Sequence, residues 1–275
     1  MDRSSERLKL TKDSWLLEAV RKNNIADIRV LIEMGADINP QFNVWLDSPL
    51  LLAIRHGHTD IVEVLISNGA KTGIKDSNGE CPIHFAVAYG NKKVVQMLIN
   101  HGANIDEKYE DGYTLLHVAV VMNDKEMVEL LLKNGANIEA EGEMEETPLL
   151  KAVDIGNAEM VQLLISKGAN LETRDYYYKT PLFVAVERGF TSIVEILLKN
   201  GSDTDAKLLH GETSLIEAIF QVNAEIVKML LMYGASLMIT ANKENTPLEC
   251  ALKKPNTKKL DLIKVIVFHK HDSIM

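Results

Sequence analysis

The chain has 275 residues and a net charge of −9 at pH 7, and its 46% of hydrophobic residues is typical of a folded protein and not of a disordered one. No apolar run approaches the ~18 residues of a membrane-spanning helix, and residues 1–15 lack the apolar stretch of a signal peptide. Two cysteines cannot supply a disulfide framework, so we expect an intracellular, cytoplasmic protein without membrane contact, and a nuclear location fits the sequence equally well.

Helical units are predicted along the whole chain. Residues 1–11 form a polar segment, and residues 12–42 contain two helical segments that end at Gly35-Ala36. Six units of 33 residues then follow one another through residues 43–243. Residues 244–275 form a last, irregular unit, in which residues 253–259 are an insertion relative to the period.

Two short motifs define this period. A motif like Thr-Pro-Leu starts at Ser48, Cys81, Thr114, Thr147, Thr180, Thr213 and Thr246. A motif like Gly-Ala starts at Gly69, Gly102, Gly135, Gly168, Gly201 and Gly234. Because the two motifs keep the same step of 33 residues and stay in phase, they indicate an internal structural repeat.

The chemistry of each unit predicts a pair of helices. Thr or Ser caps the first helix, and the following Pro occupies its first turn. The second helix has one apolar face, for example Ile61, Val62 and Leu65, and the glycine after it supplies a left-handed end. A loop of about ten residues, rich in turn formers, leads to the next unit. We therefore expect Gly135 to be left-handed and Thr147 to cap a helix.

This pattern resembles the ankyrin repeat family, whose signature includes Thr-Pro-Leu-His and Gly-Ala. Cys81-Pro82-Ile83-His84 and Thr114-Leu115-Leu116-His117 are near matches, and the resemblance covers residues 12–270. It implies an all-α repeat solenoid of stacked helix-turn-helix units, with projecting loops or hairpins that form a concave face. It also implies capping repeats at 12–42 and 244–275, and histidines at positions 84 and 117 that bond loop backbone.

No motif for catalysis or cofactor binding occurs in the chain. Gly-x-Gly, His-Glu-x-x-His and Cys-x-x-Cys are all absent, and Cys81 and Cys250 stand where structural residues are expected. We therefore predict a protein that is not an enzyme and that has no cofactor, no bound metal and no disulfide.

The acidic charge is concentrated in the middle of the chain. Residues 106–146 contain twelve acidic residues and three lysines, so this segment carries a net charge of −9, equal to that of the whole chain. Phosphate backbones are repelled by such a surface, which disfavours nucleic-acid binding. The acids either keep the protein soluble or attract a basic partner, and the sequence leaves both interpretations open.

The resemblance implies that loop tips and the last turns of the first helices line the concave face. The candidate partner-binding residues at the tips are Trp45, Glu110, Asp111, Tyr113, Glu143, Met144, Glu146, Tyr176, Tyr177 and Leu209. Those at the helix ends are Tyr89, Met122, Ile155, Arg188 and Phe220. A run of aromatic residues at Tyr176-Tyr177-Tyr178 is unusual for a loop tip and favours a contact surface, although packing on neighbouring loops would also explain it.

These observations predict a monomeric adaptor or scaffold that binds a partner protein with apolar and basic residues. The expected ridge runs from Tyr113 and Met122 through Met144 and Ile155 to Tyr176 and Tyr177. An alternative is the substrate-recognition module of a larger assembly such as a ubiquitin ligase. Ankyrin proteins of viruses and intracellular bacteria also act on host proteins, and a purely structural spacer would tolerate any substitution on the concave face.

Overall fold

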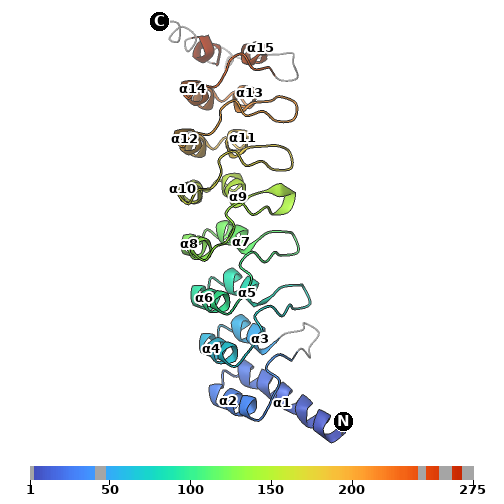
Figure 1. Cartoon of the computed structure of the whole chain (residues 1–275). Coiled ribbons are helices and arrows are strands. Elements are labelled where there is room, and N and C mark those ends of the chain that lie inside the picture. The colour runs from blue at the N-terminus through green and yellow to red at the C-terminus, as the bar shows by residue number, and fades with distance from the viewer. Residues whose placement is uncertain (1–2, 41–47, 241–245, 254–261, 268–275) are drawn as a thin grey trace. The chain divides into compact units, whose positions relative to one another are not determined.

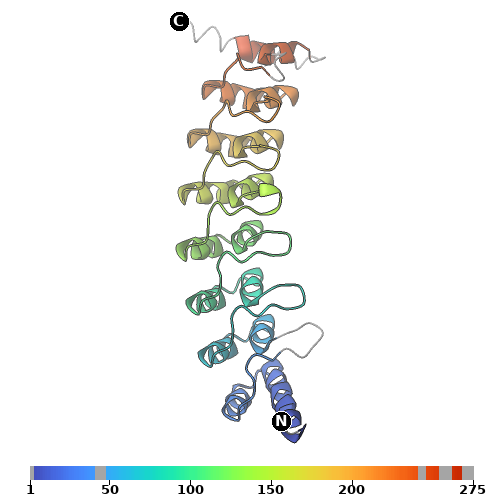
Figure 2. The ribbon, with the colours of Figure 1, turned by 45° about the vertical axis from the view of Figure 1, so that its right-hand side comes forward.

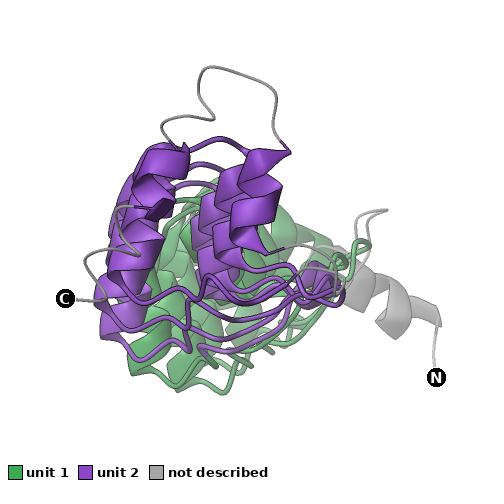
Figure 3. Ribbon diagram, turned by 90° about the horizontal axis from the view of Figure 1, so that it is seen from above, with its two compact units in different colours: residues 1–137 green, residues 138–275 purple. Residues whose placement is uncertain are grey.

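The computed structural model describes residues 3–40, 48–240, 246–253 and 262–267, with side chains from residue 12 onward (Figure 1). The described residues form helices joined by loops, with one isolated backbone bridge between Lys108 and Thr114. The fold is therefore an all-α repeat solenoid of helix-turn-helix layers. The chain divides into two compact units, which are residues 1–137 (unit 1) and residues 138–275 (unit 2) (Figure 3).

Unit 1 is a stack of helix pairs. The pairs are α1 (Arg3–Arg21) with α2 (Ile25–Glu33), α3 (Pro49–Arg55) with α4 (Thr59–Ser67), α5 (Pro82–Ala88) with α6 (Lys92–Asn100), and α7 (Leu115–Val121) with α8 (Lys125–Lys133). The first helices α1, α3, α5 and α7 contact one another in succession, and so do the second helices α2, α4, α6 and α8. Helix α1 begins at Arg3, so most of the polar segment predicted at residues 1–11 is helical.

Unit 2 repeats the same arrangement. It contains the short 3₁₀ turn η1 (Glu143–Glu145) and the helices α9 (Pro148–Asp154), α10 (Ala158–Ser166), α11 (Pro181–Glu187), α12 (Thr191–Lys199), α13 (Ser214–Phe220), α14 (Ala224–Met232) and α15 (Pro247–Leu252). Residues 262–267 are also helical. Helices α9, α11, α13 and α15 contact in succession in one row, and α10, α12 and α14 form the second row (Figures 2 and 3). The loops of this unit leave the first row on one side.

Hydroxyl caps explain where most of the first helices begin. The Oγ1 atom of Thr147 accepts the N–H of Leu150 at 3.4 Å, as predicted, and Ser48 caps α3 in the same way through the N–H of Leu51 at 3.2 Å. Each cap satisfies one N–H group that the first turn of a helix leaves without a partner. Thr180, Thr213 and Thr246 repeat this bond in unit 2.

In two repeats a histidine side chain accepts the backbone N–H of the residue that caps the first helix. The Nδ1 atom of His84 accepts the backbone N–H of Cys81 at 2.9 Å, and that of His117 accepts the backbone N–H of Thr114 at 3.2 Å. Both imidazoles are buried, and burial lowers the pKa of His84. A neutral ring is the form that can accept a hydrogen bond at Nδ1, so His84 acts as a structural residue at the helix start.

The second helices end at left-handed glycines. Gly135 has φ +94°, as its place in the repeat predicts, and Gly168 has φ +92°. In each case the next alanine N–H bonds back to a carbonyl in the helix, as from Ala136 to Leu131 at 3.0 Å. A residue with a side chain is disfavoured in this conformation, which explains why glycine recurs here.

The core of each unit lies between its helix rows. Leu116, Ala119 and Leu131 are buried in unit 1, and Leu149, Val161 and Leu164 are buried in unit 2. Each fully buried leucine or valine side chain stabilises the fold by about 1.5–3 kcal/mol. Successive layers therefore depend on one another for stability.

Polar side chains also join successive layers. The Oδ1 atom of Asp106 accepts the N–H of Asn137 at 3.0 Å. In unit 2 the carboxylates of Glu139, Glu172 and Asp205 accept the N–H groups of Asn170, Asp203 and Ser236, each at 2.8 Å. These bonds form a series of rungs between repeats, and the rungs fix the position of each loop on the next.

Candidate functional site

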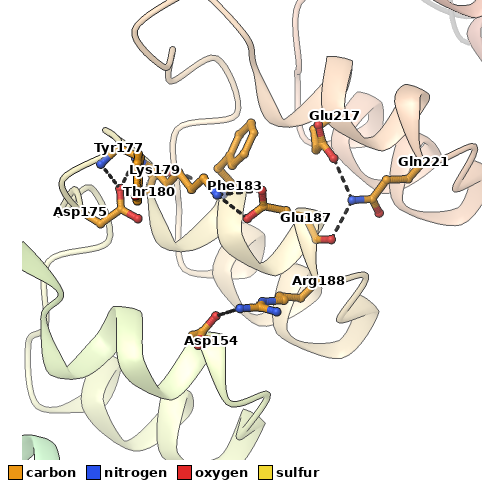
Figure 4. Close-up of polar contacts among 10 residues, drawn as sticks. All are labelled: Asp154, Asp175, Tyr177, Lys179, Thr180, Phe183, Glu187, Arg188, Glu217 and Gln221. Atoms are coloured by element: carbon orange, nitrogen blue, oxygen red, sulfur yellow. Dashed lines mark hydrogen bonds and ion pairs between the residues drawn. The ribbon is translucent and has the colours of Figure 1, made fainter. Parts of the chain in front are cut away.

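The loop tips of unit 2 have a defined conformation. At residues 175–179 the N–H of Asp175 bonds to the carbonyl of Lys179 at 3.2 Å, which closes the tip. The Oδ1 atom of Asp175 accepts the N–H groups of Tyr177 at 2.9 Å and Lys179 at 2.8 Å (Figure 4). One carboxylate therefore organises the tip from inside, which leaves the tyrosine rings on the outside.

The fourth residue of each described tip is left-handed. Glycine occupies this position in three repeats, as Gly79, Gly112 and Gly211, with φ between +76° and +85°. Glu145 and Tyr178 occupy it in the other two, with φ +59° and +62°. A side chain in this backbone region costs roughly 1–2 kcal/mol. Two neighbouring repeats of unit 2 thus carry strained, side-chain-bearing tips where the others have glycine.

The three tyrosines are exposed. Tyr176 is 58% exposed, Tyr177 51% and Tyr178 48%. The rings of Tyr176 and Tyr177 contact each other edge to face, with centroids 5.5 Å apart. Neighbouring loops therefore do not bury these rings. They form an exposed aromatic surface with polar hydroxyl groups, and such surfaces are enriched in protein interfaces.

An ion pair joins this tip to the far end of its own helix. The Nζ atom of Lys179 lies 2.7 Å from the carboxylate of Glu187, the last residue of α11 (Figure 4). The tip and the C-terminal end of the helix therefore border the same surface. We use the name inner face of unit 2 for the surface formed by three tips and three helix ends. The tips are residues 142–146, 175–179 and 208–212, and the helix ends are the C-terminal ends of α9, α11 and α13.

Hydrogen bonds connect neighbouring repeats across the inner face. The N–H of Tyr176 donates to the carbonyl of Met144 at 2.8 Å, which links two tips. At the helix ends, Nε of Arg188 donates to the Asp154 carboxylate at 2.9 Å. The side-chain amide of Gln221 donates to the Glu187 carbonyl at 2.7 Å (Figure 4). These bonds hold three successive repeats in fixed register, so the inner face is preorganised.

The same repeat occurs in a known protein family. The family description for three-copy ankyrin repeats matches residues 50–142 and 140–207, and that for many-copy ankyrin repeats matches residues 16–66. The chain belongs to the ankyrin repeat family. The ankyrin repeat domain of Bcl-3, described as a unique member of the IkappaB protein family, is similar in structure, with a TM-score of 0.72 and 28% identity. That likeness covers 78% of this chain and 96% of the Bcl-3 domain.

Curated relatives match shorter stretches. The 2-5A-dependent ribonuclease of Mus musculus is 37% identical over 28% of this chain and 11% of its own length. A putative ankyrin repeat protein of Rickettsia bellii is 31% identical over 28% of the chain and 41% of its own length, and one of fowlpox virus is 38% identical over 22% and 18%. The chain thus spans less than half of each relative. What is shared is the ankyrin repeat, a fold that generally mediates protein–protein interaction and is typically not catalytic.

Several residues predicted for partner binding lie on the inner face of unit 2. These are Glu143, Met144, Ile155, Tyr176, Tyr177, Leu209 and Phe220, and all of them are exposed. Met144 and Leu209 come from tips, whereas Ile155 and Phe220 come from helix ends. Exposed apolar side chains thus occur at the tips and helix ends of three successive repeats.

Two further predicted residues on this face have internal partners. Glu146 is half-buried, and its carboxylate pairs with Nζ of Lys151 at 3.2 Å. Arg188 pairs with Asp154 through both Nε and a terminal guanidinium nitrogen. Their charges are therefore largely satisfied within the ankyrin repeats.

Other predicted residues belong to unit 1. Tyr89, Glu110, Asp111 and Met122 are exposed there, whereas Tyr113 is half-buried with its ring 5.2 Å from that of His117. The ridge expected to join Tyr113 and Met122 to residues of unit 2 stays a prediction. Trp45 lies outside the described residues.

Four of the twelve acids of the middle segment have structural roles that composition could not reveal. Asp106 and Glu139 form rungs between repeats, and Asp124 caps α8 by accepting the N–H of Met127 at 3.0 Å. Glu107 lies 2.6 Å from Nζ of Lys75, and this hydrogen bond holds the pKa of the carboxyl below its usual value. The candidates for attracting a basic partner are therefore the exposed tip acids, which are Glu110 and Asp111 in unit 1 and Glu143 and Glu145 in unit 2.

Two residues of the inner face, Glu145 and Lys179, are not among the candidates predicted from the sequence. Glu145 could have been found by aligning the tips, because it replaces the glycine at the fourth position, as Tyr178 does in the next repeat. Lys179 gave no such signal, since its link to Glu187 depends on how the tip folds back over α11.

Neither cysteine offers an accessible thiol. Cys81 and Cys250 are buried, and burial raises the pKa of the Cys81 thiol, which opposes formation of a reactive thiolate. Across the described ranges, no three His, Cys, Asp or Glu side chains are grouped in a way that suits a metal ion. The helices in those same ranges include none with the length and apolar character needed to cross a bilayer.

Proposed function

We propose that this ankyrin repeat protein is a binding scaffold or adaptor that recognises a partner protein through the inner face of unit 2. The observation that carries the proposal is the exposed run Tyr176-Tyr177-Tyr178 on a tip whose backbone is fixed by Asp175. A rigid aromatic surface loses little conformational freedom on binding, which favours affinity. Tyrosine is also enriched among the residues that dominate binding energy.

The charge pattern of the inner face supports a partner with both apolar and basic residues. The pairs of Lys179 with Glu187 and of Arg188 with Asp154 neutralise most charges at the helix ends. The exposed carboxylates of Glu143 and Glu145 are left beside the aromatic tip. Apolar and aromatic contacts should therefore set the lifetime of the complex, while the carboxylates accelerate association with a basic partner.

A recognition module of a larger assembly, such as a ubiquitin ligase, would use the same face. Such a module also requires a second protein of the assembly, which binds elsewhere on the chain. No nucleic-acid ligand is proposed, because the exposed acids of both units repel phosphates.

The proposal is tested by binding kinetics. A partner is first identified by affinity capture with the full chain, and its association and dissociation are then measured for the double variant Tyr176→Ala/Tyr177→Ala. We expect dissociation to become at least ~10-fold faster, because truncating two central aromatic contacts removes hot-spot interactions. Folding should be retained, since both side chains lie outside the core.

A matched control exists in the same unit. Met232 and Tyr233 are also exposed neighbours, but they lie at the end of the second-row helix α14. The variant Met232→Ala/Tyr233→Ala should bind like the unchanged protein. If the control variant loses binding while the tip variant keeps it, the partner docks on the second row of helices and the inner face is the wrong site.

A further inference from the structure

The three tyrosines of the tip differ in their cationic neighbours. The guanidinium of Arg174 lies 6.0 Å from the ring centroid of Tyr178, and Nζ of Lys179 lies 5.8 Å from that of Tyr177. For Tyr176, the most exposed of the three, the described part of the chain supplies no cation over the ring. An aromatic face attracts cations, so the exposed face of the Tyr176 ring can bind one.

Two glutamates belong to the tip that bonds to the backbone of Tyr176. The N–H of Tyr176 bonds to the carbonyl of Met144, which places the ring's backbone beside the tip that carries Glu143 and Glu145. Both glutamates are exposed, and neither forms an ion pair with another described residue. The two joined tips therefore carry an aromatic ring and two negative charges, a set of groups that complements a cation.

The chain itself places cations over aromatic rings beside an acceptor, with Lys179 over Tyr177 and with arginines at two other rings. In unit 1 the guanidinium of Arg55 lies 4.5 Å from the ring centroid of Phe85 and donates to the Asp76 carboxylate at 2.8 Å. Arg174 likewise lies over Tyr178 and donates to the Lys207 carbonyl at 2.8 Å. A planar guanidinium can stack on a ring while its N–H groups reach an acceptor, which a lysine ammonium does less well.

We propose that the tip formed by Glu143, Met144, Glu145 and Tyr176 binds an arginine side chain of the partner protein. The guanidinium stacks on Tyr176 and donates to the two carboxylates, while an apolar neighbour of that arginine contacts Met144. The partner is thus a protein with an exposed segment in which arginine stands next to an aliphatic residue. This inference rests on the proposed function and specifies the chemistry that the inner face recognises.

The test uses a short probe and the full chain. The peptide acetyl-Leu-Arg-Leu-amide is titrated at low salt against protein with labelled tyrosine rings and methionine methyls, and the tip resonances are followed by NMR. The same titration with citrulline in place of arginine removes the charge and keeps the shape. We expect the arginine peptide to bind at least ~5-fold more tightly than the citrulline peptide.

Two variants assign this preference to named groups. Glu143→Gln/Glu145→Gln should remove most of the preference, because the amides keep the shape and lose the charge. Tyr176→Leu, followed at the Tyr177 ring and the Met144 methyl, should weaken the arginine peptide several-fold and leave the citrulline peptide nearly unchanged. The control Glu225→Gln/Tyr233→Leu alters exposed residues of the same types on α14 and should change nothing.

Three results would overturn the arginine site. They are equal affinities of the two peptides, an arginine preference that survives in both tip variants, or no shift of any tip resonance into the millimolar range. Equal binding of both peptides at the tip would leave the inner face as the docking surface and refute only the arginine. If the partner protein binds the Tyr176→Ala/Tyr177→Ala variant with unchanged kinetics, the proposed function itself is refuted.

Discussion

At the scale of single residues, the loop tips depend on one backbone position that glycine fills without strain. Tyr178 occupies it with φ +62°, and Glu145 occupies the equivalent place in the preceding repeat with φ +59°. Both side chains are exposed and contribute nothing to the core. A strained residue on an exposed tip is expected where its side chain serves binding rather than stability.

Replacing Tyr178 by glycine should therefore stabilise the fold. We expect Tyr178→Gly to raise the free energy of unfolding by about 1 kcal/mol, because glycine adopts positive φ without a steric penalty. Thermal or denaturant unfolding measures the change. The mirror variant Gly79→Ala, at φ +76° with no atom near the added Cβ, should lower stability by a similar amount. A destabilised Tyr178→Gly variant would mean that the ring supports the tip.

Some features of single residues could be predicted from the sequence, and some contacts of their side chains could not. The aromatic tip was predicted because three consecutive tyrosines conflict with the small polar residues that tips prefer. The internal pairing of Glu146 with Lys151 was not predictable, since it depends on the exact path of the turn η1 into α9. Arg188 reaches Asp154 across a repeat boundary, so its partner follows only from the stacked geometry.

At the scale of elements, helix starts and ends followed directly from local chemistry. Thr147 and Gly135 behave as predicted because a hydroxyl cap and a left-handed glycine act through bonds only a few residues long. The rungs between repeats were missed, because an acid such as Glu172 bonds to a backbone N–H 31 residues away. From composition alone that carboxylate counts only as surface charge, whereas in the structure it joins two layers.

The rung at Glu172 gives a pH dependence of unusual sign. Burial raises the pKa of Glu172, so the folded protein favours the protonated form more than the unfolded chain does. This acid therefore opposes folding at pH 7, and its unfavourable contribution disappears as the pH falls from its raised folded pKa to below its unfolded value near 4.5.

Glu172→Gln isolates this effect. Glutamine can still accept the N–H of Asp203 through its carbonyl oxygen, but it carries no charge. We expect the variant to be at least as stable as the unchanged protein at pH 7, and the difference to shrink toward zero as the solution is acidified. Unfolding curves across this pH range measure the difference. A variant that is less stable at pH 7 would show that the charged rung strengthens the fold.

At the scale of the whole molecule, the period of 33 residues predicted the fold class because each repeat buries its apolar faces only against its neighbours. The period says much less about function, because tip residues do not enter the core and can vary freely. Function must therefore be inferred from what the tips and helix ends carry, and in unit 2 these carry exposed aromatic and aliphatic side chains on a preorganised face.

Hydrogen–deuterium exchange of the full chain, alone and bound to its partner, tests this central claim most directly. The inner face as docking surface predicts slower exchange in the complex at the tips 142–146, 175–179 and 208–212. The helices α10, α12 and α14 should exchange at the same rate in both states. Protection confined to α10, α12 and α14, with unchanged tips, would contradict the account and place the partner on the second row of helices.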